Sequence, residues 1–297
     1  MRPSRPVPPG TRSDPDTTVM DLIAAFARRS EFEKARALLA GQRLPYEVLS
    51  PDPGWSLVGA PALVCDSQGL SAIHSDHEII CAGWTEYRAS TAEIPEQPPV
   101  RFEEDVFQEA VIMFFGKCMA DETRVRLIAH LAGDLTAVLP YVNGTMPQAC
   151  FNAGPCTLTF MDGQRMITLY SRRIAIGKAD DLVDGWRTLE RIRVLVNRTW
   201  AQRGTLVPSY VLRAKPSALE IYRRLPRTNC MACGEQTCMA FAVSLWQGRA
   251  LPSQCRPVFR EEHAELRAAL LEICQGLGVG TTVAENISGG VWGDLRL

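Results

Sequence analysis

The sequence predicts an α+β protein of three units, and three observations carry this prediction. Strand-like and helix-like segments follow one another in the order β-α-β-β-α-β over residues 19–90, which is the order of a ferredoxin-like sandwich. A β-hairpin pattern surrounds Asp162-Gly163, and four cysteines gather in a short stretch near the end of the chain. We therefore expect a ferredoxin-like unit at 19–90, a second α+β unit with a β-hairpin at 104–203 and a small helical module at 217–260.

The elements of the first unit follow from the spacing of its apolar residues. The apolar run MDLIAAFA, residues 20–27, is typical of a buried strand. Residues 28–42 then place Phe32 and Leu39 at helical spacing, with Gly41 as a stop signal. Further along, the patterns indicate a strand over 44–51, a strand over 61–66, a short helix over 69–80 and a last strand over 81–89.

The second unit follows a polar, proline-containing stretch, residues 91–103, that we interpret as a linker. Asp162-Gly163 is a type I′ turn signal between two alternating strands. The helix predicted over 180–203 has acidic residues at its start and an apolar stripe through Trp186. The other elements are a helix over 106–120 (VFQEAVIMFFGKCMA), a strand over 123–133 and a helix over 134–146 with Asp134 as its cap.

Composition limits the classes of partner and the compartment. The 297 residues carry a net charge of −1, which does not favour broad binding to nucleic acid or anionic membranes. The longest apolar runs are too short to span a bilayer. Residues 1–18 are rich in Pro, Arg and Ser and predict a disordered arm with no signal-peptide core. We expect a cytoplasmic protein, in which clustered thiols stay reduced and serve metal or redox chemistry.

The clustered cysteines follow the pattern Cys230-x2-Cys233-x4-Cys238-x16-Cys255. Four thiolates can hold a [4Fe–4S] cluster, one on each iron. Structural zinc is normally bound by two separated cysteine pairs, which the x4 and x16 spacings fit less well. We predict that Cys230, Cys233, Cys238 and Cys255 bind a [4Fe–4S] cluster, with a zinc ion or unligated thiols as the alternatives.

The residues between these cysteines fit the same interpretation. Gly234 allows the backbone to pass close to a cluster, and a helix is predicted from Cys238 to Gly248, with Phe241 on its apolar face. A return loop through Pro252 would bring the fourth thiol back to the site. Beyond the module, residues 261–297 predict a helix and a Gly-rich tail.

The stretch LPRTNCMACGEQTCMAFAVSL…QC resembles a small four-cysteine [4Fe–4S] domain of two protein families. One is the large subunit of the corrinoid iron–sulfur protein of acetyl-CoA synthesis, and the other is an iron–sulfur component of Rnf-type electron-transport complexes. The resemblance implies a low-potential, one-electron [4Fe–4S] centre. The chain departs from both families, because it shows no TIM-barrel pattern for a corrinoid and lacks the anchor and the further cysteine clusters of the Rnf component. The whole chain also resembles uncharacterised iron–sulfur proteins that carry this module at the C-terminal end, and its first unit is similar to proposed sulfur- or selenium-carrier domains.

Other candidate residues have ordinary alternative interpretations. Cys81 could be the reactive thiol of a carrier, although a free cysteine in a strand is more often a small buried apolar residue. Cys150 and Cys156 could join a second metal site, but no further ligand pair lies near them in the sequence. His74 and His77 could bind a metal, but exposed polar residues are the more typical interpretation. His130 is more typical of a sheet histidine. Arg172, Arg173 and Lys178 could dock an acidic partner, but they are more typical of a solvated surface.

The sequence thus favours a [4Fe–4S] cluster-binding protein. The expected function is one-electron transfer to or from a partner protein, a metalloenzyme or its accessory system. The alternative is an assembly or maturation factor with a structural or transferable cluster. An enzyme with its site between the first two units ranks last, because no catalytic constellation is visible.

Overall fold

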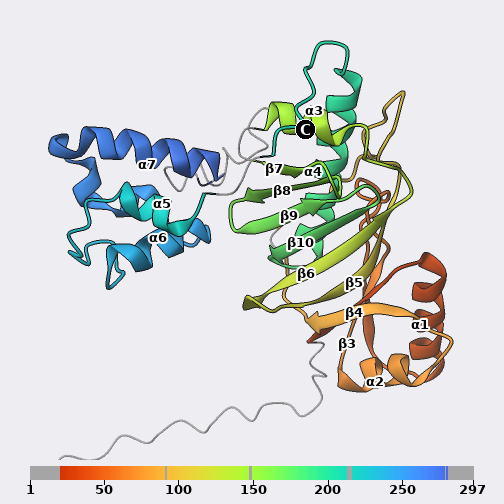
Figure 1. Ribbon diagram of the computed structural model, residues 1–297. Helices are drawn as coiled ribbons and strands as arrows, with labels where there is room; N and C mark the ends of the chain where they lie inside the picture. Colours follow the sequence, from red (N-terminus) through yellow and green to blue (C-terminus); the bar gives the residue numbers. More distant parts are fainter. Residues whose placement is uncertain (1–20, 91, 147–148, 213–215, 278, 280–297) are drawn as a thin grey trace, which may run out of the picture.

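A computed structural model of the chain describes residues 21–90, 92–146, 149–212, 216–277 and 279. The predicted arm at 1–18 and most of the predicted Gly-rich tail lie outside the described residues. Figure 1 shows a body of two sheets and, beside it, a small helical module. This mixture of helices and antiparallel sheets agrees with the predicted α+β class. Within the described part of the chain, no helix combines the length and apolarity that a bilayer crossing needs.

The first sheet belongs to the N-terminal unit, whose elements follow the predicted β-α-β-β-α-β order. Its strand order is β2-β3-β1-β4, and all three neighbouring pairs are antiparallel. The elements are β1 (Leu22–Phe26), α1 (Arg29–Gly41), β2 (Tyr46–Leu49), β3 (Ala62–Cys65), α2 (Ser67–Ser75) and β4 (Cys81–Glu86).

Both faces of this sheet are covered, which explains why β1 reads as a continuous apolar run. Successive side chains of a strand point to opposite faces. Phe26 packs with Phe32 of α1 in the core under the two helices. Ile23 and Ala25 face the other way and belong to the large core shared with the second unit.

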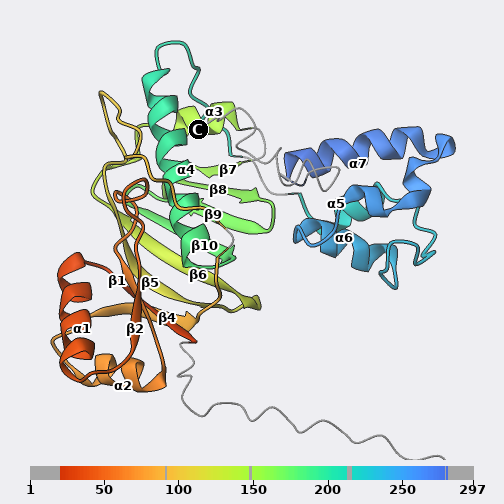
Figure 2. The same ribbon diagram turned by 180° about the vertical axis from the view of Figure 1, so that it is seen from behind.

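The second sheet has six strands in the order β5-β6-β10-β9-β8-β7, all paired antiparallel. One long helix, α4, packs along it with the fully buried Trp186, Leu189 and Ile192 on its inner stripe. Figure 2 shows α4 running across this face of the sheet. The elements are β5 (Ala110–Cys118), β6 (Asp121–Leu131), α3 (Leu139–Thr145), β7 (Cys150–Asn152), β8 (Thr157–Asp162), β9 (Arg165–Leu169), β10 (Arg173–Ala179) and α4 (Leu182–Ala201).

The predicted hairpin is confirmed, but its turn differs in type and place. Asp162 pairs with Arg165, so the loop residues are Gly163 and Gln164. Of these two, only Gly163 has a positive φ, at 57°. A glycine with positive φ at the first loop position is typical of a type II′ turn, whereas type I′ needs positive φ at both positions.

The helix predicted over 106–120 is wrong, because this stretch forms strand β5. Its backbone pairs with β6 from Ala110 to Cys118, and the pairing is irregular between Ile112 and Phe114. A second irregularity lies between Lys117 and Cys118. The two irregularities shift the alternation of the strand, so that Ile112, Phe115 and Cys118 are buried three residues apart. They thus give a strand the spacing of a helix face.

The helix predicted over 134–146 is only partly present, since α3 begins at Leu139. Asp134 does not cap it. Its carboxylate instead accepts a hydrogen bond from the Thr136 N–H at 2.8 Å, which makes a local Asx turn. Pro140 in the first turn of α3 needs no backbone donor there, and this fits the later start of the helix.

The stretch between the two sheets contains no helix or strand over residues 92–103. It nevertheless packs onto the body, because Ala92 and Ile94 lie against the large core and the guanidinium of Arg193 donates to the Val100 carbonyl at 2.6 Å. The predicted domain boundaries stay predictions, since the two α+β units share this core.

The helical module has a core of its own. Ile221, Phe241, Leu245 and Leu270 are fully buried within it. The module meets the body at the β8–β9 turn, where Gly248 approaches the Gly163 carbonyl so closely that a Cβ atom would lie 2.8 Å from it. Its elements are α5 (Ala218–Arg223), α6 (Cys238–Trp246), the 3₁₀ turns η1 (Pro252–Gln254), η2 (Arg256–Phe259) and η3 (Glu261–His263), and α7 (Ala264–Gly276).

Candidate metal centre

The four predicted ligands line one hollow at the surface of the helical module. Cys230, Cys233, Cys238 and Cys255 all border it, and its space is about 310 Å³, part of which is open to solvent. The first two thiols come from the loop between α5 and α6, the third from the start of α6, and the fourth from the junction of η1 and η2. The fold therefore brings Cys230 and Cys255, which are 25 positions apart in the sequence, to the same hollow.

The loop before α6 has an unusual backbone. Arg227, Asn229 and Met231 have φ values of 58°, 48° and 56°, and Gly234 has 89°. A positive φ is strained for most residues that carry a Cβ, and it persists only where the surroundings enforce it. Alternation of right- and left-handed residues turns successive N–H groups to one side, a geometry found at many iron–sulfur sites. Such a loop suits a group with negative charge.

Cys238 is held by Asn229 through two hydrogen bonds. The Cys238 N–H donates to the Asn229 side-chain oxygen at 2.8 Å, and the Asn229 N–H donates to the Cys238 Sγ at 3.4 Å. Cys238 is the first residue of α6, next to the cap residue Thr237, whose hydroxyl accepts from the Ala240 N–H at 3.0 Å. A thiolate at the N-terminus of a helix is stabilised by the helix dipole.

Cys255 closes the hollow from the side of the apolar core. It is 5% exposed and packs in the same core as Phe241 and Leu245. Burial raises the pKa of its thiol, the Val258 N–H lowers it by hydrogen bonding, and the other three thiols of the hollow raise it further by their charge. This electrostatic effect is the one expected of sulfur atoms that lie near one another.

Cys230 lies on the opposite, exposed side. The pKa of its thiol is lowered, first by a hydrogen bond with the backbone of Ala232, then by one with the side chain of Thr228, and also by the charge of Arg260. Cys233 is partly exposed. The hollow therefore has two buried thiols on its inner wall and two more accessible ones on its rim.

The donor set consists of thiols. In the described ranges of the chain, no three His, Cys, Asp or Glu side chains are grouped so as to hold one metal ion. The four thiols nevertheless line one hollow, and cysteine thiolates are the donors that hold iron–sulfur clusters.

The remaining cysteines do not converge on the hollow or on a second site. Cys65, Cys118 and Cys274 are buried, and burial raises the pKa of Cys65 to about 11 and that of Cys274 to about 12. The Cys81 thiol donates to the carbonyls of Ala25 and Gly83, both at 3.3 Å, and burial raises its pKa. The environments of Cys65, Cys81 and Cys274 favour neutral thiols.

The other polar candidates are at the surface. Cys156 lies in the turn before β8, and burial raises the pKa of its thiol, while Cys150 is in β7. His74 and His77 are exposed, and the ring centroid of His74 is 6.4 Å from that of Trp84. Arg173 stacks over the ring of Tyr170 at 4.2 Å.

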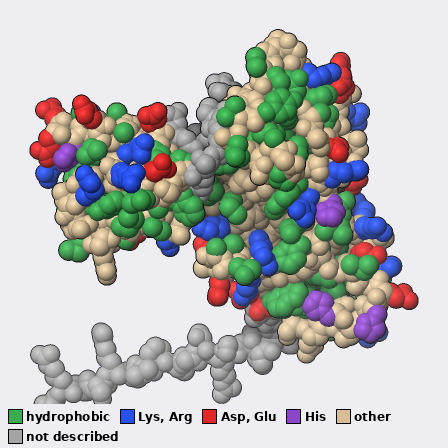
Figure 3. Space-filling view, viewed as in Figure 1, with side chains coloured by type: hydrophobic (Ala, Val, Ile, Leu, Met, Phe, Trp, Pro, Cys, Tyr) green, Lys and Arg blue, Asp and Glu red, His purple; other side chains and the backbone are tan. Residues whose placement is uncertain are grey.

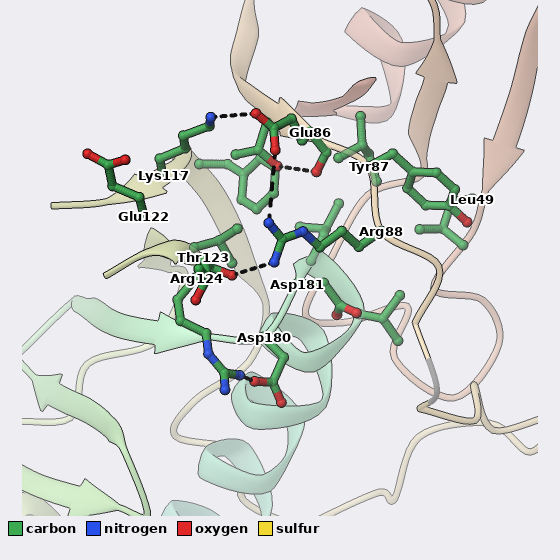
Figure 4. A pocket seen from close by; sticks show the side chains of 16 residues that line it. Leu49, Glu86, Tyr87, Arg88, Lys117, Glu122, Thr123, Arg124, Asp180 and Asp181 are labelled. Atoms are coloured by element: carbon green, nitrogen blue, oxygen red, sulfur yellow. Dashed lines mark hydrogen bonds and ion pairs between the residues drawn. The ribbon is translucent and has the colours of Figure 1, made fainter. Parts of the chain in front are cut away.

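A second hollow, of about 460 Å³, lies between the two sheets of the body. Figure 4 shows charged side chains around it that pair with one another. Lys117 contacts Glu86 at 2.7 Å, Arg88 donates to the Thr123 carbonyl at 3.0 Å, and Arg124 pairs with Asp180. These paired side chains form a polar contact between the two α+β units.

Sequence reasoning did not foresee the groups that position the thiols. Asn229 and Thr228 act through hydrogen bonds, and Arg260 acts through its charge, from 30 residues beyond Cys230. Thr237 directly before a helix carries a recognisable signal, because Thr is a common N-cap residue. Asn229 also carries one, since Asn tolerates positive φ better than other residues with a Cβ.

Comparison with known proteins agrees with the geometry. A family model described as "Putative Fe-S cluster" matches residues 225–257, which include all four thiols. The stretch with the four thiols is therefore similar to an iron–sulfur cluster domain, which agrees with the predicted iron–sulfur protein. No solved structure gives a significant match to the chain.

Curated relatives are similar over a small part of the chain. The gamma 2 subunit of the acetyl-CoA decarbonylase/synthase complex of Methanosarcina thermophila is 48% identical over 56 residues, which are 19% of this chain and 12% of that protein. The gamma subunit of Archaeoglobus fulgidus is 47% identical over 45 residues, 15% of this chain and 10% of that protein. That of Methanocaldococcus jannaschii is 51% identical over 41 residues, 14% and 8% of the two chains. This chain thus spans about a tenth of the length of these relatives.

Proposed function

We propose that the chain is a one-electron carrier that holds a [4Fe–4S] cluster on Cys230, Cys233, Cys238 and Cys255. The observation that carries this proposal is the convergence of the four thiols on one hollow. Four thiolates from separate parts of a loop, a helix start and a return turn match the one-thiolate-per-iron requirement of such a cluster. When bound, the cluster supplies reversible one-electron chemistry, and the protein supplies burial, hydrogen bonds to sulfur and access.

The difference in exposure between the ligands supports electron transfer. Cys238 and Cys255 are 8% and 5% exposed and lie in the apolar core of the module, which limits water on that side. Cys230 is exposed. A carrier needs a protected centre together with one accessible edge through which a partner can approach, and the hollow combines both.

The two α+β units would add further contact surface for a partner, and the proposed compartment is the cytoplasm, where thiols stay reduced. The strand order β2-β3-β1-β4 with antiparallel neighbours supports a ferredoxin-like arrangement of the first unit. The relatives named above are subunits of an acetyl-CoA decarbonylase/synthase complex, which supports a metalloenzyme system as the partner.

Anaerobic purification of the full chain tests the proposal. We expect a brown protein with about four irons per chain, which dithionite converts to a paramagnetic form and which air or a mild oxidant restores. One zinc per chain without colour would refute the cluster. A brown protein that cannot be cycled between two redox states would refute electron transfer while leaving the cluster intact.

The alternative function is that of an assembly or maturation factor, and the exposure of Cys230 favours it, because an exposed ligand can be released to an acceptor. The two functions give opposite results when the loaded protein meets an iron-free ferredoxin. Transfer of iron and colour to the acceptor supports assembly, whereas retention of the cluster with reversible electron exchange supports a carrier.

A further inference from the structure

The segment that holds the four cysteines is richer in arginine than in acidic residues. Residues 223–260 contain six arginines and one glutamate, with no lysine or aspartate, which gives a formal net charge of +5 with the thiols neutral. The helical module as a whole, residues 216–277, contains seven arginines and six glutamates and has a formal net charge of +1. In Figure 3, acidic side chains lie along the upper edge of the module, and basic side chains lie below them. Within the module, positive charge is therefore concentrated in the cysteine-bearing segment.

Three of these arginines lie in the sequence within three positions of residues that line the hollow, and we call them the arginine rim: Arg227, Arg256 and Arg260. Arg227 stands between Pro226 and Thr228, and Arg256 stands between Cys255 and Pro257, four residues that line the hollow. Arg260 is close enough to Cys230 for its charge to act on that thiol.

The arginine rim is directed to solvent and is mostly unpaired. All three side chains are exposed. Arg260 contacts Glu262 at 3.8 Å, and both of these side chains are more than 60% exposed, so water and salt screen the pair strongly. Neither Arg227 nor Arg256 forms an ion pair with another residue in the described part of the chain. Exposed charges without an internal partner remain available to a partner of opposite sign.

The rim also has an apolar component. Met231 is 63% exposed and Phe259 is 38% exposed, and they flank Cys230 and the arginine rim in the sequence. Glu235 also lines the hollow, and its carboxylate accepts a hydrogen bond from the Ser244 hydroxyl at 2.6 Å. Apolar contacts next to exposed charged side chains are typical of an interface that first attracts and then holds a partner.

We propose that the arginine rim is the docking surface for an acidic redox protein, with electrons passing through the exposed edge of the hollow at Cys230. This inference rests on the proposed electron-carrier function and names the chemistry of its partner. Each transfer moves one electron and no proton: the reduced carrier loses the electron and the partner gains it. The rim raises the encounter rate with negatively charged partners, and this effect declines as salt increases.

Small redox complexes of opposite charge test the rim in the full-length, iron-loaded protein. The probes are tris(oxalato)cobaltate(III), an anion, and hexaamminecobalt(III), a cation, each of which takes one electron to become cobalt(II). We expect the anion to oxidise the reduced protein roughly tenfold faster at low salt than at high salt, and the cation to show the reverse trend. Substitution of Arg227, Arg256 and Arg260 by Glu should lower the rate with the anion at least tenfold at low salt and remove its salt dependence.

The control is Arg101→Glu, which makes the same charge change at an exposed position in the body and should alter the rates less than twofold. Iron content and reduction potential are measured for every variant, so that a change in driving force is separated from a change in encounter. The single variants Arg227→Gln and Arg260→Gln replace the triple variant if it does not load iron, with smaller effects in the same direction. Equal salt trends for the two probes would overturn the proposal that the arginine rim is a docking surface. A triple variant that reacts as fast as the wild type would overturn it as well.

A redox-inert anion separates this inference from the proposed function. Tris(oxalato)chromate(III) is paramagnetic and should broaden the NMR signals of residues around the rim in the oxidised protein, but not in the triple variant. If the protein cannot be reduced, electron transfer fails, and the chromium probe still decides whether the rim binds anions. A DNA oligonucleotide that binds through the same arginines when the chromium complex does not would assign the rim to nucleic acid and overturn the proposal.

Discussion

Residues 21–212 and residues 216–277 each bury an apolar core, but only the second core has converging thiols in its wall. The body packs two sheets and α4 around Trp186, and its five cysteines are spread over four strands and one turn. The module is small, and Cys238 and Cys255 are part of its core. A small core gives little stability by itself. We therefore expect the body to be stable through packing, and the module to depend also on the cluster that we propose its thiols hold.

The largest effect is expected from Cys255→Ser. The change removes one ligand from the buried wall of the hollow, so we expect most of the iron to be lost, together with the order of the module. Iron analysis and circular dichroism of the full chain measure both. Cys274→Ala is the matched control, since Cys274 is buried in the same module but does not line the hollow.

Two further thiols extend this test to the whole chain. Cys233→Ser should sharply lower iron content, and Cys156→Ser, in the body, should leave it unchanged. Loss of iron in the Cys156 variant with retention in the Cys233 variant would show that the ligands are other thiols.

Removal of iron by a chelator should affect the two regions unequally. Binding energy at a metal centre is also folding energy for the part that it holds together. We expect amide exchange in α6 to become roughly tenfold or more faster after iron removal, while exchange in α4 stays the same. Equal acceleration in both helices would mean that module and body unfold as one cooperative unit, and no change in α6 would mean that the module is stable without iron.

The two regions also differ in what could be predicted from the sequence. The order of the first six elements and the ends of α4 follow from local apolar spacing. Strand β5 was missed because a bulge between Ile112 and Phe114 changes the phase of its buried side chains. A bulge depends on pairing with β6, and this pairing is not visible in local spacing.

The thiols of the module were identified from spacing, yet the groups around them were not. Cysteine ligands carry a recognisable pattern, because each must reach a corner of one compact group. The residues that orient them act through backbone conformation and long-range charge. The positive φ of Asn229 and the approach of Arg260 to Cys230 depend on the folded loop, so their roles required the structure.

Substitutions at Asn229 should give an intermediate effect in the module. Asn229→Gly keeps the positive φ but loses the bond from the side chain to the Cys238 N–H, which we expect to cost about 1 kcal/mol. Asn229→Ala loses the same bond and adds backbone strain, about 1 kcal/mol more. Both variants should release iron to a chelator faster, with Ala faster than Gly. Equal rates for wild type, Gly and Ala would show that the hydrogen bond from the Cys238 N–H to the Asn229 side chain does not hold the site.

The smallest effect on stability is expected from substitutions at the helix caps, which can be compared between the two regions. Thr237 caps α6 and Asp181 caps α4, each by accepting an N–H bond three residues ahead. Loss of a cap costs about 1 kcal/mol in either region, so Asp181→Ala should lower the stability of the body whether or not iron is present. Thr237→Ala should lower the stability of the module mainly in iron-free protein, because a bound ligand at Cys238 fixes the same helix end from its first residue. Thr237→Ser, which retains the hydroxyl, should behave like the wild type. Denaturant unfolding followed separately in the module and the body measures all three. An equal loss for Thr237→Ala with and without iron would show that ligation at Cys238 does not order the start of α6.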